Sequence, residues 1–324
     1  MKNNFLIWAL IDDQPGNQNQ IYGVLNQLKL PFKIQKVHYN FLSRLPNFLL
    51  QILGGSIHLK KKINLKTPYP KLILSCGRRT FPLAKKIRNK IFPTPLFIHF
   101  MYPRGSYKTS DADIIFTPQH DKVKKKSNLI ETIGATNLIN KINYKKKTSQ
   151  GKKKIILILL GGNHGKYKLK TVDVNYIINE VTDKIKDNGY IFLSTSRRTP
   201  DKIIKLIENL RIKNKKLSQV FHPNRNKIKN PILEMLKDCD EIVVTGDSMS
   251  MISEACSTNK PVRIFYNDDI CSKKHILFCN YLIKNNYAFS FETLLKKCHK
   301  IKTLETTKFV SEKILLHIKN DRKK

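Results

Sequence analysis

Short apolar runs recur along this chain, and each is followed by a turn rich in Gly, Asp, Ser or Arg and then by a polar or helical segment. The runs cover residues 5–10, 72–76, 97–101 and 113–116 in the first half and 155–160, 190–194 and 241–244 in the second, and a more polar strand is expected near 33–38. Strands that alternate with helices in this way form parallel sheets that helices cover on both faces. The sequence therefore predicts an α/β fold with two Rossmann-like domains and a cleft between them.

The division into domains rests on chain length and on one polar segment. The chain has 324 residues, which is about two domains at ~150 residues each. Residues 141–154 are rich in Lys and include Gly151, as expected of a linker. We therefore predict an N-terminal domain over residues 1–145 and a C-terminal domain over residues 146–324.

The turn that begins at Thr245 predicts an anion-binding site. It follows the run 241–244 and opens a segment with helical spacing. The first N–H groups of a helix have no partner inside the helix, and the helix dipole adds positive potential there. A phosphate or diphosphate would bind to these groups, and Glu254 would reach ribose hydroxyls from further along the helix. The candidate binding residues are Gly246, Asp247, Ser248, Ser250, Met251 and Glu254. A helix whose Ser and Asp residues act only as caps is the alternative.

Two other loops of the second half carry further candidates for this site. They are Gly161 and Gly162 after the run 155–160, and Ser196, Arg197 and Arg198 after the run 190–194. Ligands of open parallel sheets bind beyond the carboxyl ends of the strands, so these loops are expected to converge. A guanidinium group matches phosphate oxygens through two parallel hydrogen bonds. Surface arginines that pair with helix carboxylates are the alternative.

Asp13, His120 and Asp121 are the candidate catalytic residues, because they also follow strands. A His or a carboxylate in a cleft would act as the general base, with Asp12 a candidate beside Asp13. For His120 and Asp121, a capping role in a loop and the start of a metal site both stay open. The sequence has no clustered Asp and His ligand group, and arginines supply positive charge. We therefore expect neither a metal ion nor a cofactor.

The formal net charge is +37, from 61 basic and 24 acidic side chains. Such a charge attracts nucleic acid, acidic lipid headgroups or phosphorylated substrates, although codon bias in an AT-rich genome would also enrich Lys. No aromatic-rich basic motif or zinc-finger spacing is present, so nucleic acid is not expected as a partner. Residues 41–59 are apolar and precede three lysines. This segment predicts either a core helix or a helix on an anionic membrane.

The six cysteines form no Cys-x-x-Cys pair, which favours a reduced cytosolic compartment. The first apolar run ends in a polar loop after a few residues, unlike a secretory signal. We expect a cytoplasmic protein, with peripheral attachment to the inner face of the membrane as an open alternative. The sequence does not predict an oligomeric state.

The second half resembles the donor domain of GT-B glycosyltransferases, especially those that transfer N-acetylglucosamine to lipid-linked acceptors. The resemblance rests on Gly161-Gly162-x-x-Gly165 and on Ser248 to Ser253-Glu254 with the later Pro261. It implies that the helix N-terminus holds a diphosphate and that Glu254 binds ribose. It also implies that the last helix, within residues 307–324, packs back on the N-terminal domain.

The whole chain is similar to the bacterial relatives of the plant "elongated mitochondria" (ELM) fission factor, a family loosely labelled nucleoside-diphosphate-sugar epimerase. The matching motifs are Asp13-x-x-Gly16-x-x-x-Gln20, Gly77-Arg78-Arg79-Thr80, Pro118-x-His120-Asp121, Gly161-Gly162, Ser196-Arg197-Arg198-Thr199-Pro200 and Thr245-x-Asp247-Ser248-x-Ser250-Met251-x-Ser253-Glu254-Ala255. Many relatives carry His after the first-loop Gly, where this chain has Asn17. That replacement argues against a histidine base at this position.

Together the residues and the resemblance predict a metal-independent, GT-B-type glycosyltransferase-like protein. Its C-terminal domain would bind a nucleotide-sugar, and its N-terminal domain would hold an acceptor, such as a lipid-linked one. Two alternatives stay open. One is a non-catalytic, membrane-associated adaptor of the same fold, and the other is a nucleoside-diphosphate-sugar epimerase.

Overall fold

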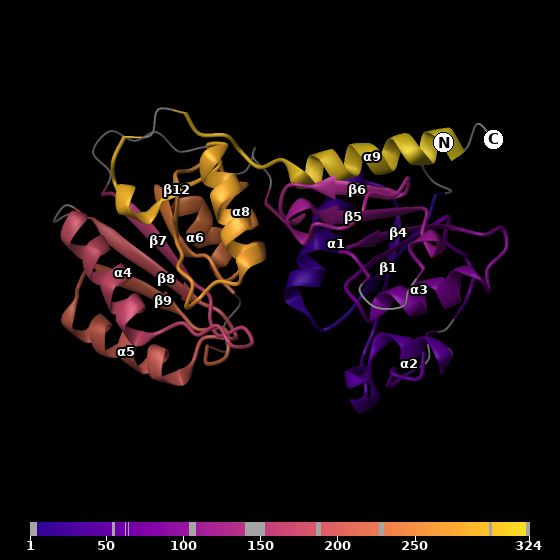
Figure 1. The fold of residues 1–324 in the computed structure, drawn as a ribbon, viewed down its shortest axis with the longest axis horizontal. Helices are drawn as coiled ribbons and strands as arrows, with labels where there is room; N and C mark the ends of the chain where they lie inside the picture. The colour runs from indigo at the N-terminus through magenta and orange to yellow at the C-terminus, as the bar shows by residue number, and fades with distance from the viewer. Residues whose placement is uncertain are drawn as a thin grey trace. The chain divides into compact units, whose positions relative to one another are not determined.

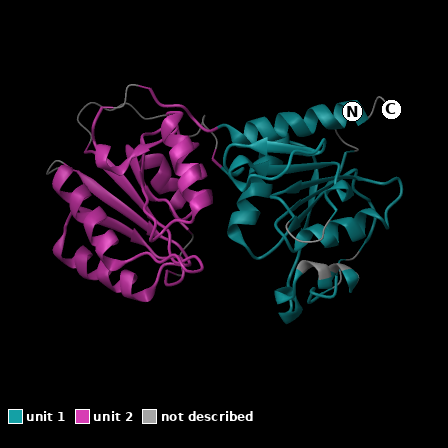
Figure 2. Cartoon of the chain, viewed as in Figure 1, with its two compact units in different colours: residues 1–138, 305–324 teal, residues 139–304 magenta. Residues whose placement is uncertain are grey.

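The computed structural model describes residues 5–53, 56–61, 63, 65–103, 108–139, 153–185, 189–226, 230–297 and 300–321. The chain forms two compact units (Figure 2). Unit 1 comprises residues 1–138 and 305–324, and unit 2 comprises residues 139–304. The change of unit therefore lies at residue 138, a few residues before the sequence-based boundary, and the C-terminal segment belongs to unit 1.

Unit 1 is built on a six-stranded parallel sheet in the order β2-β1-β3-β4-β5-β6 (Figure 1). The strands are β1 (Ile7–Ile11), β2 (Phe32–Lys36), β3 (Leu72–Cys76), β4 (Leu96–Phe100), β5 (Ile114–Pro118) and β6 (Leu129–Thr132). The helices are α1 (Pro15–Leu28), α2 (Asn47–Ile52), α3 (Thr80–Arg88) and α9 (Thr306–Asp321), with 3-10 turns η1 (Phe41–Arg44), η2 (Thr109–Asp111) and η3 (Gln119–Asp121). This order matches the flavodoxin-like doubly wound sheet, in which the order of strand addition reverses between the first and third strands.

Both faces of the unit 1 sheet are buried, which explains why its central strands read as continuous apolar runs. On β1, Ile7 and Ala9 join a cluster with α1 and α9, whereas Trp8 and Leu10 join a cluster with α3. Alternate side chains of a strand point to opposite faces, so each face receives its own helices. The helices thereby fix the β1 and β3 ends that carry the loops described below.

The last helix, α9, packs on unit 1. Its apolar stripe of Val310, Ile314 and Ile318 lies in the same core cluster as the buried residues of α1. At its start, the Thr307 hydroxyl donates to the carbonyl of Asn137 over 3.0 Å and accepts from the Asn137 N–H over 2.9 Å. Apolar burial and these two hydrogen bonds together hold the helix on its own unit.

Unit 2 is built on a second six-stranded parallel sheet in the order β12-β11-β10-β7-β8-β9. The strands are β7 (Ile155–Leu160), β8 (Tyr190–Thr195), β9 (Leu217–Phe221), β10 (Glu241–Thr245), β11 (Val262–Phe265) and β12 (Phe289–Ser290). The helices are α4 (Thr171–Lys184), α5 (Asp201–Lys213), α6 (Ile232–Asp238), α7 (Met249–Cys256) and α8 (Lys273–Lys284), with a 3-10 turn η5 (Phe291–Thr293). If the strands of unit 2 are numbered from one to six along the chain, their order is that of the dinucleotide-binding Rossmann sheet. In that sheet the order of strand addition reverses between the first and fourth strands.

The α/β fold with two Rossmann-like units is thus confirmed. In unit 2, α4 and α5 cover one face of the sheet and contribute Val174, Ile177 and Ile203 to a core cluster with Ile156 and Ile158 of β7 (Figure 1). The apolar runs 155–160, 190–194 and 241–244 correspond to β7, β8 and β10, whereas no run predicted β9 or β12.

In the segment 41–59, where the sequence predicts a core helix or a helix on a membrane surface, the structure has η1, the short helix α2 and turns. Pro46 separates η1 from α2. Leu50 is fully buried, whereas Phe41 is 79% exposed and Ile52 is 75% exposed. The segment therefore has both a core contact and an exposed apolar side. The side chain of Phe48 and residues 54 and 55 lie outside what the structure describes.

In the part of the chain that the structure describes, no helix has the length and apolarity needed to cross a bilayer.

Candidate functional site

Several loops of unit 2 are hydrogen-bonded to one another at the point where the strand order of its sheet reverses. There β7 and β10 are neighbours, with Leu159 opposite Val244 in the register. The register carries Gly161, just past β7, to the same level as Gly246, just past β10. Ligands of open α/β sheets bind in the crevice at such a switch point. The sequence-based expectation that these two loops converge is met in the structure.

The buried carboxylate of Asp247 holds three loops of this site together. Its Oδ2 accepts from the Gly162 N–H over 2.8 Å and from Nη2 of Arg198 over 3.0 Å. Its Oδ1 accepts from the Thr245 hydroxyl over 2.7 Å, and that hydroxyl accepts from the Gly161 N–H over 2.8 Å. Asp247 is therefore a positioning residue, because both of its oxygens are engaged by the protein.

The glycines of these loops are required by close packing. A Cβ on Gly161 would lie 2.1 Å from the Asp247 carboxylate oxygens, and one on Gly162 would lie 2.2 Å from the backbone of Arg198. A Cβ on Gly246 would lie 2.6 Å from Cβ of Tyr266. Such distances are too short for any side chain, so only Gly permits these three close approaches.

The two arginines after β8 differ in the contacts of their guanidinium groups, although the sequence predicted the same phosphate-binding role for both. Nη1 of Arg198 donates to the carbonyls of Gly162 and Asn163, both over 3.2 Å, in addition to the Asp247 contact. Arg197 is exposed, and among the described residues its guanidinium group has no hydrogen bond or ion pair. Arg197 is the cation that can turn to a ligand, and Arg198 braces the loop. Ser196 is half-buried, and its hydroxyl accepts from the Arg198 N–H over 3.1 Å.

Helix α7 begins at Met249, directly after the Asp247 loop. Ser248 occupies the N-cap position without a side-chain hydrogen bond to the helix, so the capping role that the sequence allowed is not filled. Ser250, Met251 and Glu254 are half-buried on this helix. The first turn of α7 thus presents backbone N–H groups and positive potential at the switch point, which is the arrangement that anions prefer.

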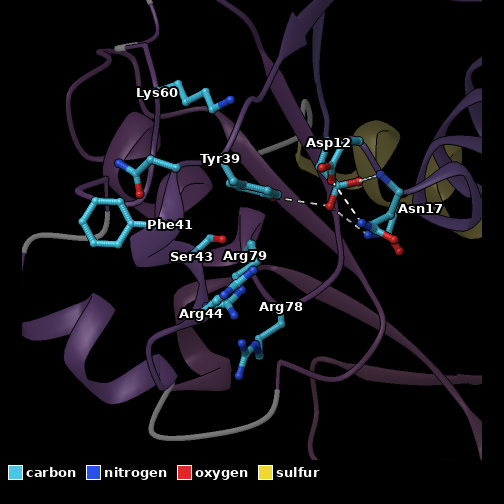
Figure 3. A pocket seen from close by; sticks show the side chains of 12 residues that line it. Asp12, Asn17, Tyr39, Phe41, Ser43, Arg44, Lys60, Arg78 and Arg79 are labelled. Carbon is cyan, nitrogen blue, oxygen red and sulfur yellow. Dashed lines mark hydrogen bonds between the residues drawn. The ribbon is translucent and has the colours of Figure 1, made fainter. Parts of the chain in front are cut away.

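Unit 1 has a pocket at its own switch point. The pocket measures about 590 Å³ and is lined by the loop after β1, the loop after β3 and the segment around η1 (Figure 3). We call it the unit 1 pocket; its lining residues are Asp12, Asp13, Gln14, Asn17, Tyr39, Asn40, Phe41, Ser43, Arg44, Lys60, Arg78 and Arg79. Leu10 pairs with Ser75 in the register, which places the Asp12 and Gly77 loops side by side.

Asp12 is the buried carboxylate of the unit 1 pocket. Its Oδ2 accepts from Nδ2 of Asn17 over 2.9 Å and from the Tyr39 hydroxyl over 3.3 Å, and its Oδ1 accepts from the Gln14 N–H over 3.1 Å (Figure 3). Burial raises the pKa of Asp12, although the hydrogen bonds from Asn17 and Gln14 act in the opposite direction. Asp13, the sequence-based candidate, is exposed on the same pocket. Asp12 is therefore the buried carboxylate of the two, with a pKa that burial raises.

We expect the wild-type chain to gain stability relative to Asp12→Asn as the pH falls from about 7 to about 4. A carboxyl whose folded pKa is raised stabilises the fold when protonated, and this contribution is lost as the pH rises through the folded pKa. The measurement is the difference in melting temperature between the two chains across this range. A difference that moves the other way with pH would show that Asp12 is stabilised as a carboxylate.

His120 and Asp121 do not line the unit 1 pocket. They form η3 after β5, and two strands of the sheet separate β5 from β1. His120 is buried and Asp121 is half-buried. The structure therefore separates these two candidates from Asp13, which sequence order alone had not done.

Sequence reasoning missed Tyr39, Arg44 and Lys60 as parts of a site. They come from irregular chain around η1, and no motif marks them. Asn17 was noticed only as a departure from relatives, yet it donates to Asp12 from the first turn of α1. One feature of the sequence could have predicted that Asp12 is buried, because Asp12 comes directly after the last residue of a fully buried strand.

The two units define a fold shared with GT-B glycosyltransferases and nucleotide-sugar epimerases. A putative UDP-N-acetylglucosamine 2-epimerase from Listeria monocytogenes matches with a TM-score of 0.58 and 10% identity, over 98% of this chain and 97% of that chain. Acinetobacter baumannii MurG matches with a TM-score of 0.53 and 10% identity, over 96% and 99%. S. aureus MnaA, solved with UDP, matches with a TM-score of 0.52 and 14% identity, over 98% and 97%.

The chain belongs to the mitochondrial fission ELM1 family, whose family model matches residues 15–318. An uncharacterised Rickettsia prowazekii protein, RP120, is 29% identical over 97% of this chain and 98% of its own length. The mitochondrial fission protein ELM1 of Arabidopsis thaliana is 24% identical over 68% of this chain and 57% of its own length. The resemblance derived from the sequence motifs is confirmed.

Proposed function

We propose that unit 2 binds a nucleotide-sugar and that the chain is a glycosyltransferase-like protein of its family. The observation that carries the proposal is the convergence of the β7, β8 and β10 loops on the N-terminus of α7 at a switch point. Proteins of the same fold supply support, since the S. aureus structure was solved with UDP. Backbone N–H groups and a cation at this place suit a diphosphate.

Each residue of the unit 2 site receives a defined role in this proposal. The diphosphate would lie against Ser248, Ser250 and Met251 at the start of α7, with the guanidinium group of Arg197 beside it. Glu254 would accept hydrogen bonds from ribose hydroxyls. Gly161, Gly162, Gly246, Asp247 and Arg198 would hold the loops in place, with Ser196 supporting the Arg198 loop.

The transfer itself would need no metal ion under this proposal. As the bond between the sugar and the diphosphate breaks, the helix N-terminus and Arg197 would stabilise the negative charge on the leaving group. Unit 1 would hold the acceptor. We propose that a carboxylate of the unit 1 pocket, Asp12 or Asp13, accepts the proton of the acceptor hydroxyl. His120 and Asp121 are less suitable because they do not line that pocket.

A panel of nucleotide-sugars tests the proposal in the presence of a chelator. A ligand present at about 100 times its Kd stabilises the fold by about 2.7 kcal/mol, so a true donor should raise the melting temperature clearly. Nucleoside monophosphates and sulfate are the controls, because the net charge of +37 attracts any anion. If no nucleotide-sugar stabilises the chain more than these controls do, the proposal fails.

The same panel separates the enzymatic alternatives. Release of free nucleotide with an acceptor present identifies a transferase, whereas conversion of the sugar without net release identifies an epimerase.

One observation favours a second candidate function, that of a membrane-associated adaptor. Phe41, Ile52 and Leu53 are exposed apolar side chains, and the exposed Lys60 and Lys61 follow them in the chain. An apolar surface next to basic residues suits an anionic lipid surface. Flotation with acidic and neutral vesicles, using Ile52→Asp, tests this candidate; equal binding to both, unaltered by the substitution, would remove it.

A further inference from the structure

The unit 1 pocket lies where the strand order of the unit 1 sheet reverses, which makes it a second candidate ligand position in the chain. The order β2-β1-β3 places this reversal between β1 and β3, and the loops that follow these two strands line the pocket together with the segment around η1. In flavodoxin-like sheets the ligand binds at this switch point. The position, the volume of about 590 Å³ and the polar lining together mark a built site.

The lining of this pocket carries more positive than negative charge. It includes four basic side chains, from Arg44, Lys60, Arg78 and Arg79, and two carboxylates. Across the described part of the chain, the side chains of Arg44, Lys60 and Arg78 have no hydrogen bond or ion pair. Three cations that share one pocket without a protein counter-ion are available to an anionic ligand.

Arg79 is held in place and shapes the pocket. Its Nη1 donates to the carbonyl of Leu45 over 2.9 Å, and its own carbonyl contacts Nε2 of His58 at 3.0 Å. His58 stacks on Tyr39 with ring centroids 5.5 Å apart, and its pKa is lowered by burial. These contacts tie η1, the loop after β3 and Tyr39 into one wall, so the cations have a fixed frame.

Asp12 and Tyr39 supply hydrogen-bond acceptors to the pocket, in contrast to its cations. Figure 3 shows the Tyr39 hydroxyl directed at the Asp12 carboxylate, with Arg44, Arg78 and Arg79 on another side of the pocket. A phenol that donates to a carboxylate keeps its oxygen lone pairs for a ligand O–H. The pocket therefore offers arginines on one side and the hydrogen-bond acceptors Asp12 and Tyr39 on another, whereas Lys60 lies across Tyr39 from the arginines in this view (Figure 3).

We propose that the unit 1 pocket binds a phosphate monoester of a hydroxyl-bearing molecule. A phosphate monoester carries between one and two negative charges near neutral pH and three acceptor oxygens, which matches the guanidinium groups of Arg44 and Arg78. A monocarboxylate would leave most of this positive charge unmatched. The ligand hydroxyl would donate to Asp12 or Tyr39. This proposal concerns unit 1 alone and does not depend on nucleotide-sugar binding in unit 2.

Two sources can present this group to the pocket. One is a soluble polyol phosphate, and the other is a lipid whose headgroup is a phosphate monoester. Phe41 lines the pocket and is 79% exposed, so an apolar tail would have a contact at the rim. The probes are therefore glycerol 3-phosphate and vesicles that contain phosphatidic acid. Vesicles of equal charge made with phosphatidylglycerol, a phosphate diester, are the control.

The test is a calorimetric titration of glycerol 3-phosphate into the full chain at about 0.15 M salt, where the Debye length is about 8 Å. Arg44→Gln and Arg78→Gln should each weaken binding about tenfold, as expected when a charged hydrogen bond is lost. Both side chains are exposed, so the fold should persist. Arg211→Gln removes the same charge from an exposed position on α5 and should leave the affinity unchanged.

The outcomes are distinct. Binding of phosphatidic acid vesicles alone, with loss in Arg78→Gln, supports the proposal and identifies a lipid source. Binding of neither probe, or equal weakening by Arg211→Gln, would overturn it in favour of diffuse surface charge. Asp12→Asn should reduce the preference for glycerol 3-phosphate over inorganic phosphate, and an unchanged preference would refute the hydroxyl contact.

Discussion

Replacement of Asp247 by Ala is expected to lower the stability of unit 2 by about 2–4 kcal/mol and to abolish donor binding. The side chain is completely buried in its ion pair with Arg198 and also accepts from the Gly162 N–H and the Thr245 hydroxyl. Its loss leaves these three donors without their acceptor. Because they belong to three separate loops, the loops should separate and the start of α7 should lose its frame.

The measurements are the melting temperature and the nucleotide-sugar affinity of the same variant. Asp201→Ala is the matched control, because Asp201 pairs with Arg225 at 2.8 Å but its side chain is 80% exposed. Exposed pairs contribute about 0–1 kcal/mol, so this control should change little. Comparable stability of the two variants would show that the Asp247 network does not hold the loops.

Replacement of Glu241 by Ala is expected to cost about 3–5 kcal/mol, the largest stability effect that the structure predicts. Glu241 and Arg263 form an ion pair of 2.7 Å on neighbouring strands β10 and β11, and their side chains are only 4% and 2% exposed. Arg263 also donates to the Lys296 carbonyl over 2.8 Å. Without the carboxylate, a buried guanidinium group is left without its counter-ion.

Urea unfolding of the full chain, followed by circular dichroism, measures this effect. The double variant Glu241→Leu with Arg263→Met should recover much of the loss, since well-packed apolar pairs can replace buried ion pairs. Glu180→Ala is the control, because Glu180 forms a partly exposed i,i+4 pair with Lys184. A double variant no more stable than Glu241→Ala would show that packing, and not the unpaired charge, causes the loss.

The fold could be predicted from the sequence because each buried strand is a short apolar run that ends in a turn. The 155–160 run, for example, became β7 with the same bounds. The strand order could not be predicted in this way. It depends on which strand each crossover places beside β7, and spacing along the chain does not encode that choice.

The site was predicted in part for the same reason. Gly162, Arg198 and Asp247 were identified by their places after strands, but their contacts span up to 85 residues of sequence. The sequence-based prediction assigned all three to a ligand, whereas the structure shows them hydrogen-bonded to one another. In unit 1, the residues that complete the pocket with Asp12 come from the irregular segment around η1, where no periodic pattern exists to guide a prediction.

The most direct test of the account is a calorimetric titration of a nucleotide-sugar into the wild-type chain and into Glu254→Ala, with a chelator present. Glu254 is half-buried on α7, past the proposed diphosphate position, and the three hydrogen bonds to the Asp247 carboxylate described above come from Gly162, Arg198 and Thr245. We expect saturable binding by the wild-type chain and an affinity weakened by about 1–3 kcal/mol in the variant, with its melting transition intact. Absence of saturable binding by the wild-type chain, or an unchanged affinity in a folded Glu254→Ala, would contradict the nucleotide-sugar site of unit 2.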